Sequence, residues 1–312
     1  MRIAVVGAGS LGSVIGVLLE EAGLAPVFIE QDGNKVRLIR EKGLWLEGVS
    51  GERLVHPAIF QDPSEVGIVD LSMVLVKSYD TQSVLSTLEL ILPGKGLVLT
   101  LQNGIGNFET LNQAFPGRVL LGTTTMGAMT LAPGKFRHTG FGNIHFGEAD
   151  GTIRERTRTV ASVLEKMNSG PVHLVDNAMG CVWSKLIINA AINGPATLLK
   201  VRNGRLPETV PGRELIHNIV SESLAIVQAK GISLIFDDPE GQVIAVCKGT
   251  SENINSLFQD ILAGRRTEID FINGALAREA EGLGFFAPVN KTLTLLIKAL
   301  EIPHQERVTD QA

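Results

Sequence analysis

Three glycines near the start of the chain are spaced as GxGxxG. The motif directly follows an apolar run at Ile3–Val6 and precedes an amphipathic stretch at Val14–Glu21, an order typical of strand, tight turn and helix. Glycines there permit the turn and let the backbone approach a pyrophosphate, while the helix N-terminus faces the phosphates with its positive dipole. We therefore expect a dinucleotide to bind at Gly7, Ala8, Gly9, Ser10, Leu11 and Gly12.

An acidic residue, Glu30, follows the second apolar run at Val27–Ile29, about 20 residues beyond the glycines. A carboxylate at this position accepts a hydrogen bond from the ribose 2′-hydroxyl of NAD and repels the 2′-phosphate of NADP. Glu30 therefore favours NAD on local grounds. Two alternatives stay open: Glu30 is a solvated charge at a strand end, or the nearby Lys35, Arg37 and Arg40 receive a phosphate.

A lysine and two asparagines are spaced four residues apart in the run WSKLIINAAIN. Lys185, Asn189 and Asn193 are separated by apolar residues only. Four-residue spacing places the three side chains on one face of an α-helix. Amides beside one lysine are suited to a pocket that hydrogen-bonds a small polar ligand. A solvated stripe and a buried amide network are the alternatives.

Other polar groups are weaker candidates. Gln102-Asn103-Gly104 follows an apolar run, at the edge where doubly wound sheets bind ligands, although Asn-Gly is also a common turn. No histidine or cysteine spacing is of the metal-ligand type, and no GxSxG elbow supplies a nucleophile, so no metal is predicted. A further group in a helical region has surface charge as its alternative: Ser256, Asp260, Arg265, Arg266 and Glu268.

The elements that must position these residues fall into two classes. Through the first half, short β-branched runs alternate with helical patterns, which predicts parallel strands joined by crossover helices. Their continuous apolarity indicates burial on both faces. The expected strands are Ile3–Val6, Val27–Ile29, Leu71–Val76, Gly96–Leu101, Val119–Leu121 and Asn143–Phe146, followed by a helix around Ile153–Asn168.

Beyond a break at Ser169-Gly170-Pro171, the periodicity is almost entirely helical. We therefore predict an α/β chain: an N-terminal Rossmann-type doubly wound parallel sheet in a dinucleotide-binding domain (1–170), followed by an all-helical substrate-binding and catalytic domain (171–312). The expected helices of the second domain include Trp183–Ile192, Leu215–Ala229, Val243–Val246 and Phe271–Ala280.

Composition excludes several classes of protein. The 312 residues, 44% hydrophobic and 20% charged, indicate a globular chain long enough for two domains. Apolar runs are too short to span a membrane, and a net charge of −5 offers no basic surface for nucleic acid.

The first residues form a strand pattern rather than a leader, so we expect a cytoplasmic protein. Cys181 and Cys247 are expected to be free thiols. A homodimer is kept open.

The chain resembles the ketopantoate reductase family (2-dehydropantoate 2-reductases) over roughly residues 1–300. Four blocks match in order, and the last two are highly specific. One departure is conservative, because Ser256-Leu257 stands where the family has Ser-Met. The blocks are GAGSLG at Gly7–Gly12, a Val-Lys block ending at Lys77 with LQNGIGNFETL after it, WSKLIINAAIN at Trp183–Asn193, and ENINSLFQDILAGRRTEIDFINGAL at Glu252–Leu276.

The resemblance implies a role for each of several residues. Lys185 would donate a proton, and Glu268 would contact the cofactor and orient the site. Asn103 would hold nicotinamide and substrate near one another. The remaining residues fall into two sets: Lys77 and Ala128 would line the cofactor, and Asn189, Asn193, Asn203 and Ser256 would bind the substrate.

The resemblance also implies a reaction, the reduction of 2-dehydropantoate to (R)-pantoate in pantothenate (coenzyme A) biosynthesis. The cofactor would be NADP(H). Relatives that use NADPH commonly carry an arginine after the second strand, where this chain has Gln31 behind Glu30, so NAD(H) is the second expectation. Two alternatives remain: an NADH-dependent D-2-hydroxyacid dehydrogenase of the same superfamily acting on a bulkier 2-oxo acid, and a non-catalytic dinucleotide sensor.

Overall fold

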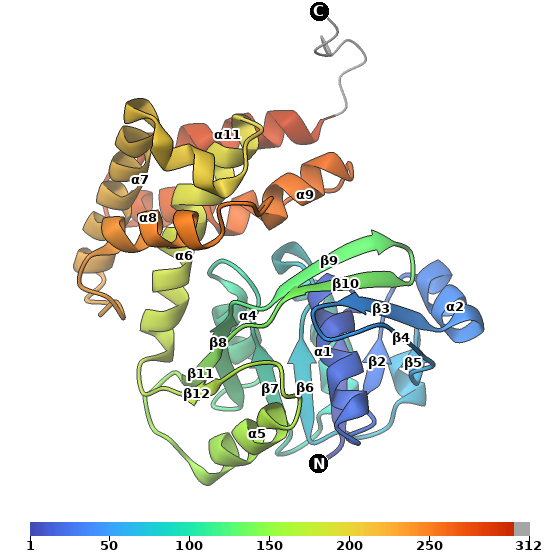
Figure 1. Cartoon of the computed structure of the whole chain (residues 1–312). Coiled ribbons are helices and arrows are strands. Elements are labelled where there is room, and N and C mark those ends of the chain that lie inside the picture. The colour runs from blue at the N-terminus through green and yellow to red at the C-terminus, as the bar shows by residue number, and fades with distance from the viewer. Residues whose placement is uncertain (303–312) are drawn as a thin grey trace, which may run out of the picture. The chain divides into compact units, whose positions relative to one another are not determined.

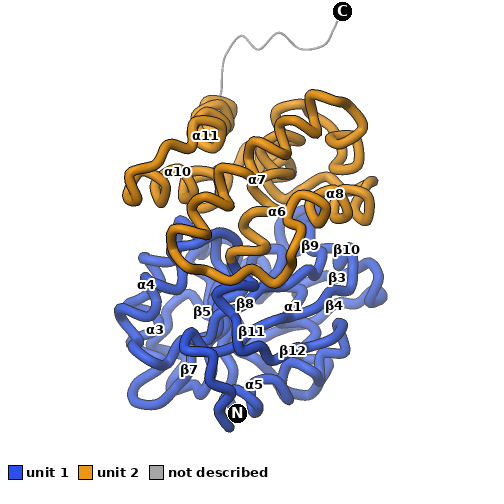
Figure 2. The backbone as a smooth tube through the Cα atoms, turned by 90° about the vertical axis from the view of Figure 1, so that its left-hand side faces the viewer, with its two compact units in different colours: residues 1–182 blue, residues 183–312 orange. Residues whose placement is uncertain are grey.

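The computed structural model describes residues 1–302 and divides the chain into two compact units (Figure 1, Figure 2). Unit 1 runs from Met1 to Val182, and unit 2 begins at Trp183. Residues 303–312, which end the predicted second domain, lie outside the described residues. All strands of the described part belong to unit 1, and the regular elements described in unit 2 are helices. The predicted fold class, α/β with a helical C-terminal region, is confirmed.

Unit 1 is built on an eight-stranded sheet. Its strands are β1 (Ile3–Val6), β2 (Val27–Ile29), β5 (Ile59–Phe60), β6 (Leu71–Val74), β7 (Leu97–Thr100), β8 (Val119–Thr124), β11 (Ile144–Glu148) and β12 (Val172–Leu174). They lie in the order β12-β11-β8-β7-β6-β1-β2-β5. Neighbours from β5 to β8 pair in parallel, so the carboxyl ends of β1, β6 and β7 share one edge of the sheet.

The far edge of this sheet departs from the prediction. β11 runs antiparallel to β8, and β12 pairs in parallel with β11 through Ile144 and Val172. Because β12 follows the Ser169-Gly170-Pro171 break, residues 171–182 belong to unit 1, whereas the predicted boundary lies after residue 170. A three-residue strand is too short to show a period of its own, which explains why only helical periodicity was expected there.

A second, four-stranded sheet was not predicted. It contains β3 (Leu44–Gly48), β4 (Arg53–Val55), β9 (Gly127–Ala132) and β10 (Lys135–Gly140), in the order β4-β3-β10-β9. A tight turn at Pro133-Gly134 joins β9 to β10, with Gly134 at φ 74°. These strands lack a long apolar run because β4 and β9 are largely half-exposed, while buried and more exposed residues alternate along β3 and β10.

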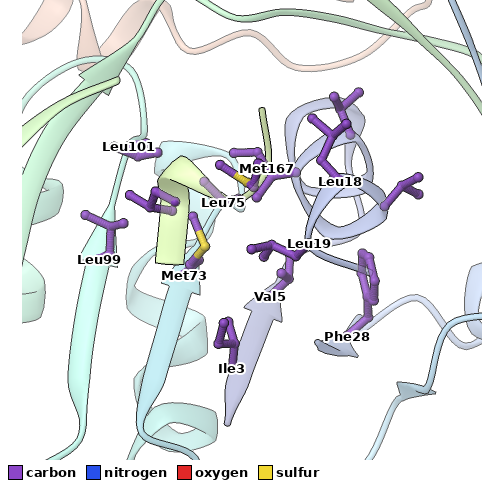
Figure 3. Close-up of a cluster of buried hydrophobic side chains, with 14 of the residues drawn as sticks. Ile3, Val5, Leu18, Leu19, Phe28, Met73, Leu75, Leu99, Leu101 and Met167 are labelled. Carbon is purple, nitrogen blue, oxygen red and sulfur yellow. The ribbon is translucent and has the colours of Figure 1, made fainter. Parts of the chain in front are cut away.

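Helices cover both faces of the large sheet. Along β1, Ile3 and Val5 join one hydrophobic cluster while Ala4 and Val6 join the other. Figure 3 shows Val5 beside Leu19 of the first helix, in the cluster that also contains Ile3 and Leu18. Burial on both faces explains the continuous apolarity of the strands. The helices of unit 1 are α1 (Ser10–Glu21), α2 (Gly33–Lys42), α3 (Leu85–Ile91), α4 (Asn107–Ala114) and α5 (Glu155–Glu165), with short 3₁₀ turns η1 (Pro63–Glu65), η2 (Ser78–Asp80) and η3 (Gln82–Val84).

The described part of unit 2 consists of helices that are joined by buried or partly buried hydrogen bonds. The buried Asn273 side chain donates to the Ala190 carbonyl at 3.1 Å and to Asn290 Oδ1 at 2.9 Å. Glu222 in turn accepts hydrogen bonds from the backbone N–H groups of Val289 and Asn290. The elements are α6 (Ala178–Leu198), which begins in unit 1, α7 (Val210–Ala229), α8 (Pro239–Gly249), α9 (Ser256–Leu262), α10 (Asn273–Gly282) and α11 (Pro288–Glu301), with η4 (Asn203–Glu208) and η5 (Ile269–Phe271).

Candidate active site

The glycine motif forms the turn between β1 and α1. Gly7 has φ 101°, and a Cβ there would lie 2.9 Å from the backbone nitrogen of Val76. A Cβ on Gly12 would lie 2.0 Å from the Gly7 carbonyl oxygen, so neither position tolerates a side chain. Around Gly9, by contrast, no atom lies within 4 Å of the Cβ position. The turn is closed behind Gly7 and Gly12 and open at Gly9, which suits the close approach of a pyrophosphate.

Glu30 follows β2 and lies against this turn. Its Oε2 accepts a hydrogen bond from the Ala8 N–H at 3.1 Å and pairs with Lys35 Nζ at 2.7 Å. With its side chain only 12% exposed, Glu30 is not a solvated charge at a strand end. Arg40, another basic residue considered for a phosphate, instead donates to the Ile59 carbonyl at 2.9 Å. The structure therefore fixes a carboxylate and one ammonium beside the glycine turn.

The small sheet also meets the glycine turn. Ser10 Oγ and Thr130 Oγ1 are 2.7 Å apart, with either hydroxyl able to donate. Thr130 lies on β9, two residues after Ala128, and α1 packs against β9 and β10. The unpredicted sheet therefore brings Ala128 to the same part of unit 1 as the start of α1.

Lys77 and Asn103 follow the adjacent strands β6 and β7, and hydrogen bonds join their two loops. The Ser78 hydroxyl donates to the Asn103 carbonyl at 2.7 Å. The Gln102 side chain donates to the Val76 carbonyl at 2.9 Å. Both predicted cofactor residues therefore stand at the carboxyl edge of the sheet, on loops that are fixed to each other.

In unit 2, the polar stripe on α6 becomes more buried along the helix. Lys185 and Asn189 are half-buried, whereas Asn193 is 6% exposed. Thr197, four residues further on and fully buried, continues the stripe; its spacing could have revealed it in the sequence. Within residues 1–302 the side-chain amides of Asn189 and Asn193 make no hydrogen bond. The stripe is therefore neither solvated throughout nor a closed amide network.

The two predicted catalytic residues interact electrostatically. Burial lowers the pKa of Lys185 to about 8, and the negative charge of Glu268 opposes this shift. Glu268 is buried and directly precedes η5. A lysine with a pKa of about 8 still carries its proton at neutral pH, yet it releases that proton more readily than an ordinary lysine. This combination is the one that a general acid requires.

Asn203 lies at the start of η4 and is held by the segment that precedes α9. Its backbone N–H donates to the Asn253 carbonyl and its side chain donates to Thr250 Oγ1, both at 3.1 Å. Among the described residues, Asn203 Oδ1 is buried without a hydrogen-bond partner. A buried acceptor of this kind can bind a hydroxyl group.

Ser256 begins α9, where Asn255 caps the helix. Asn255 Oδ1 accepts from the Phe258 N–H at 3.0 Å and from the Thr197 hydroxyl at 3.3 Å. The α6 stripe and Ser256 are thereby brought together in unit 2. Asn255 was not predicted, although an asparagine before a helix is a common cap. Its Nδ2 is buried and has no partner within residues 1–302.

The neighbouring charged residues form ion pairs. Arg265 Nε lies 3.0 Å from the carboxylate of the buried Asp260, and the Arg266 guanidinium lies 3.3 Å from the Asp270 carboxylate.

Both cysteines, Cys181 and Cys247, are buried free thiols, as expected. No helix within residues 1–302 is both long and apolar enough to cross a membrane. In the same residues, no three His, Cys, Asp or Glu side chains gather as a metal site would require.

Comparisons with known proteins match both units. The family model described as ketopantoate reductase PanE/ApbA matches residues 3–151, and its C-terminal counterpart matches residues 177–301. A 2-dehydropantoate 2-reductase of Halobacterium salinarum is 35% identical over 96% of this chain and 98% of its own. A ketopantoate reductase structure from Ralstonia eutropha superposes with a TM-score of 0.88 at 30% identity, covering 96% and 98%. A D-mandelate dehydrogenase with NADH and anilino(oxo)acetate gives 0.89 at 28%, with the same coverage.

Proposed function

The chain belongs to the ketopantoate reductase family, and we propose that it reduces 2-dehydropantoate to (R)-pantoate in pantothenate and coenzyme A biosynthesis. One observation carries the proposal from the site itself. Lys185 stands at the start of a polar stripe, near the charge of Glu268, with a pKa lowered to about 8. A dinucleotide sensor needs the glycine turn but has no use for such an acid.

Each group of residues fills one role in this reaction. The dinucleotide, when bound, supplies the hydride. The glycine turn holds the pyrophosphate, and Lys185 stabilises the developing alkoxide and protonates it to the hydroxyl of the product. Lys77 and Ala128 line the cofactor, and Asn103 holds nicotinamide and substrate near one another. The substrate is bound by Asn189, Asn193, Asn203 and Ser256, while Glu268 contacts the cofactor and orients the site.

We propose NADPH as a cofactor, with a weaker preference over NADH than is usual in the family. The carboxylate of Glu30 disfavours a 2′-phosphate, but Lys35 at 2.7 Å offsets part of its charge. The enzyme is further proposed to work in the cytoplasm without a nucleic-acid or membrane partner, and a homodimer is the oligomeric state to test.

A second candidate function is NADH-dependent reduction of a bulkier 2-oxo acid by a D-2-hydroxyacid dehydrogenase. Glu30 beside the glycine turn supports it, as does the likeness to D-mandelate dehydrogenase at a TM-score of 0.89. The sequence relatives named 2-dehydropantoate 2-reductase favour the first candidate.

Initial rates with 2-dehydropantoate and a panel of aliphatic and aryl 2-oxo acids, each with NADH and NADPH, separate these candidates. We expect the highest kcat/KM with 2-dehydropantoate. A kcat/KM about tenfold higher with an aryl 2-oxo acid would establish the second candidate instead. No turnover with any acid, together with tight dinucleotide binding, would identify a sensor.

A further inference from the structure

A network of buried polar side chains joins the loop after β6 to the loop after β7 in unit 1. Its members are Ser78, Thr81, Gln102 and Asn107, which are 2%, 2%, 9% and 4% exposed. Burying polar groups costs free energy unless each one finds a partner. The hydrogen bonds of these four residues therefore show what the network holds in place.

Asn107, the first residue of α4, stands at its centre. Its Nδ2 donates to the Asn103 carbonyl at 3.0 Å and to Ser78 Oγ at 3.1 Å, and its Oδ1 accepts from the Thr81 hydroxyl at 2.7 Å. Ser78 Oγ also donates to the Asn103 carbonyl, at 2.7 Å. The Asn103 carbonyl therefore receives two hydrogen bonds, and one amide arranges both donors.

Gln102 extends the network to the preceding loop. Its Nε2 donates to Thr81 Oγ1 and to the Val76 carbonyl, both at 2.9 Å, and its Oε1 accepts from the Thr100 hydroxyl at 2.9 Å. In both side-chain amides, at Gln102 and Asn107, the NH₂ group therefore makes two donations and the oxygen has a donor. A satisfied buried network of this kind restricts its loops to one arrangement.

The loops that the network restricts carry two residues assigned to the cofactor. Lys77 lies between Val76 and Ser78, which both take part in the network. Asn103 begins a turn in which Gly104 and Gly106 have φ of 78° and 99°, so the turn has little stiffness of its own. We propose that Asn107 is a positioning residue, which through Ser78, Thr81 and Gln102 fixes Asn103 and Lys77 against the nicotinamide end of the cofactor. This inference rests on the proposed function.

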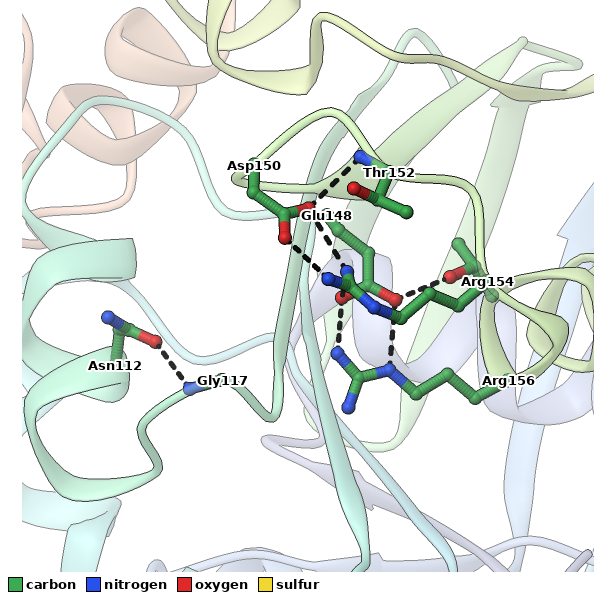
Figure 4. Close-up of polar contacts among 8 residues, drawn as sticks. Asn112, Gly117, Glu148, Asp150, Thr152, Arg154 and Arg156 are labelled. Atoms are coloured by element: carbon green, nitrogen blue, oxygen red, sulfur yellow. Dashed lines mark hydrogen bonds and ion pairs between the residues drawn. The ribbon is translucent and has the colours of Figure 1, made fainter.

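The test compares Asn107→Ala with a matched control in the same helix. The Asn112 side chain is also hydrogen-bonded, because its Oδ1 accepts from the Gly117 N–H at 3.2 Å, but it lies toward the other end of α4 (Figure 4). We expect Asn107→Ala to lower kcat about 10-fold to 100-fold, because displacement by about 1 Å has effects of that size. Asn112→Ala should leave kcat within about twofold of the unaltered enzyme.

Fragment binding separates positioning from a general loss of structure. ADP-ribose lacks nicotinamide, so its affinity should change by less than about twofold in Asn107→Ala, whereas the affinity for the whole dinucleotide should fall more. Asn107→Asp keeps the acceptor for Thr81 and loses both donations, so it should be as impaired as the alanine variant. Thr81→Ser should retain activity that Thr81→Val loses, because only serine keeps the hydroxyl.

Two results would overturn the inference: a kcat within about twofold for Asn107→Ala, or an equal loss of affinity for ADP-ribose and dinucleotide. Failure of the proposed function looks different, because the unaltered chain would then prefer another 2-oxo acid or reduce none. In that case the comparison of ADP-ribose with NADH and NADPH still decides whether Asn107 positions the nicotinamide end.

Discussion

Lys185 becomes a usable acid because its surroundings adjust a single proton. Burial lowers its pKa to about 8, and Glu268 limits the shift by favouring the charged form. The spacing of Lys185, Asn189 and Asn193 showed in the sequence that a polar face exists. Burial and the charge of Glu268 depend on segments far apart in the chain, so the tuning could not be predicted from spacing.

We predict that kcat/KM for reduction falls as pH rises through about 8, because the reaction needs protonated Lys185 and the proton is lost above its pKa. Glu268→Gln removes the charge that raises this pKa, so the fall in kcat/KM at alkaline pH should move to lower pH.

We also predict that Lys185→Ala loses about 10²-fold to 10⁴-fold in kcat while still binding dinucleotide. Lys185→Arg should stay impaired, because arginine holds its proton too tightly to donate it. A loss below tenfold in Lys185→Ala would contradict the acid role.

Glu30 shows the same limit of sequence reasoning. Its distance from the glycines predicted the ribose position, but its contacts with Ala8 and Lys35 depend on the fold and could not be predicted from the sequence.

We predict that Glu30→Arg raises the ratio of kcat/KM for NADPH over NADH by about tenfold or more, since about 1.4 kcal/mol corresponds to a factor of ten. Steady-state rates with both cofactors measure the ratio. An unchanged ratio would show that Glu30 does not face the ribose.

Among the elements, those with continuous apolarity were predicted and those with mixed exposure were missed. β1, β2, β6 and β7 lie within the expected ranges because burial on both faces favours apolar residues at nearly every position. The sheet that carries Ala128 escaped prediction because its β9 strand is half-exposed along nearly its whole length. Tertiary contact with α1, rather than local sequence preference, stabilises such strands.

One buried carboxylate, that of Glu148, joins the end of β11 to the start of α5 through hydrogen bonds. Glu148 is 5% exposed and accepts hydrogen bonds from Arg154 at 2.6 Å, from Arg156 Nε at 2.9 Å and from the Thr157 hydroxyl at 2.8 Å (Figure 4). Burial acts to raise the pKa of Glu148, but the bonds from Arg156 and Thr157 outweigh it, so the pKa lies below its ordinary value. The stability that Glu148 contributes is therefore present at neutral pH and is lost as pH falls through the folded-state pKa, below about 4.5.

We predict that Glu148→Gln lowers the free energy of unfolding at pH 7 by about 1–3 kcal/mol, because the amide cannot accept from all three donors. Urea unfolding measures the change. Glu208→Gln is the control, since its pair with Arg205 is exposed and should contribute nothing measurable. The difference between Glu148→Gln and the unaltered chain should shrink at pH 4. A change below about 0.5 kcal/mol at pH 7 would mean that the junction does not depend on this charge.

For the whole molecule, the change from alternating strands and helices to helices alone predicted two parts, and the structure has two compact units. The division falls inside α6, after Val182, because the start of this helix packs with unit 1 while its polar stripe belongs to unit 2. A helix that serves two units has uninterrupted periodicity, so no sequence pattern marks the division.

Because α6 is shared, we expect the two units to unfold together. The chain has two tryptophans, Trp45 on β3 of unit 1 and Trp183 in the part of α6 that belongs to unit 2. Oxidised dinucleotide at about 100 times its Kd should stabilise the native state by about 2.7 kcal/mol. Because loss of either unit exposes α6, we predict that urea transitions followed by Trp45 in Trp183→Phe and by Trp183 in Trp45→Phe shift equally. A shift at Trp45 with none at Trp183 would show that the units unfold independently.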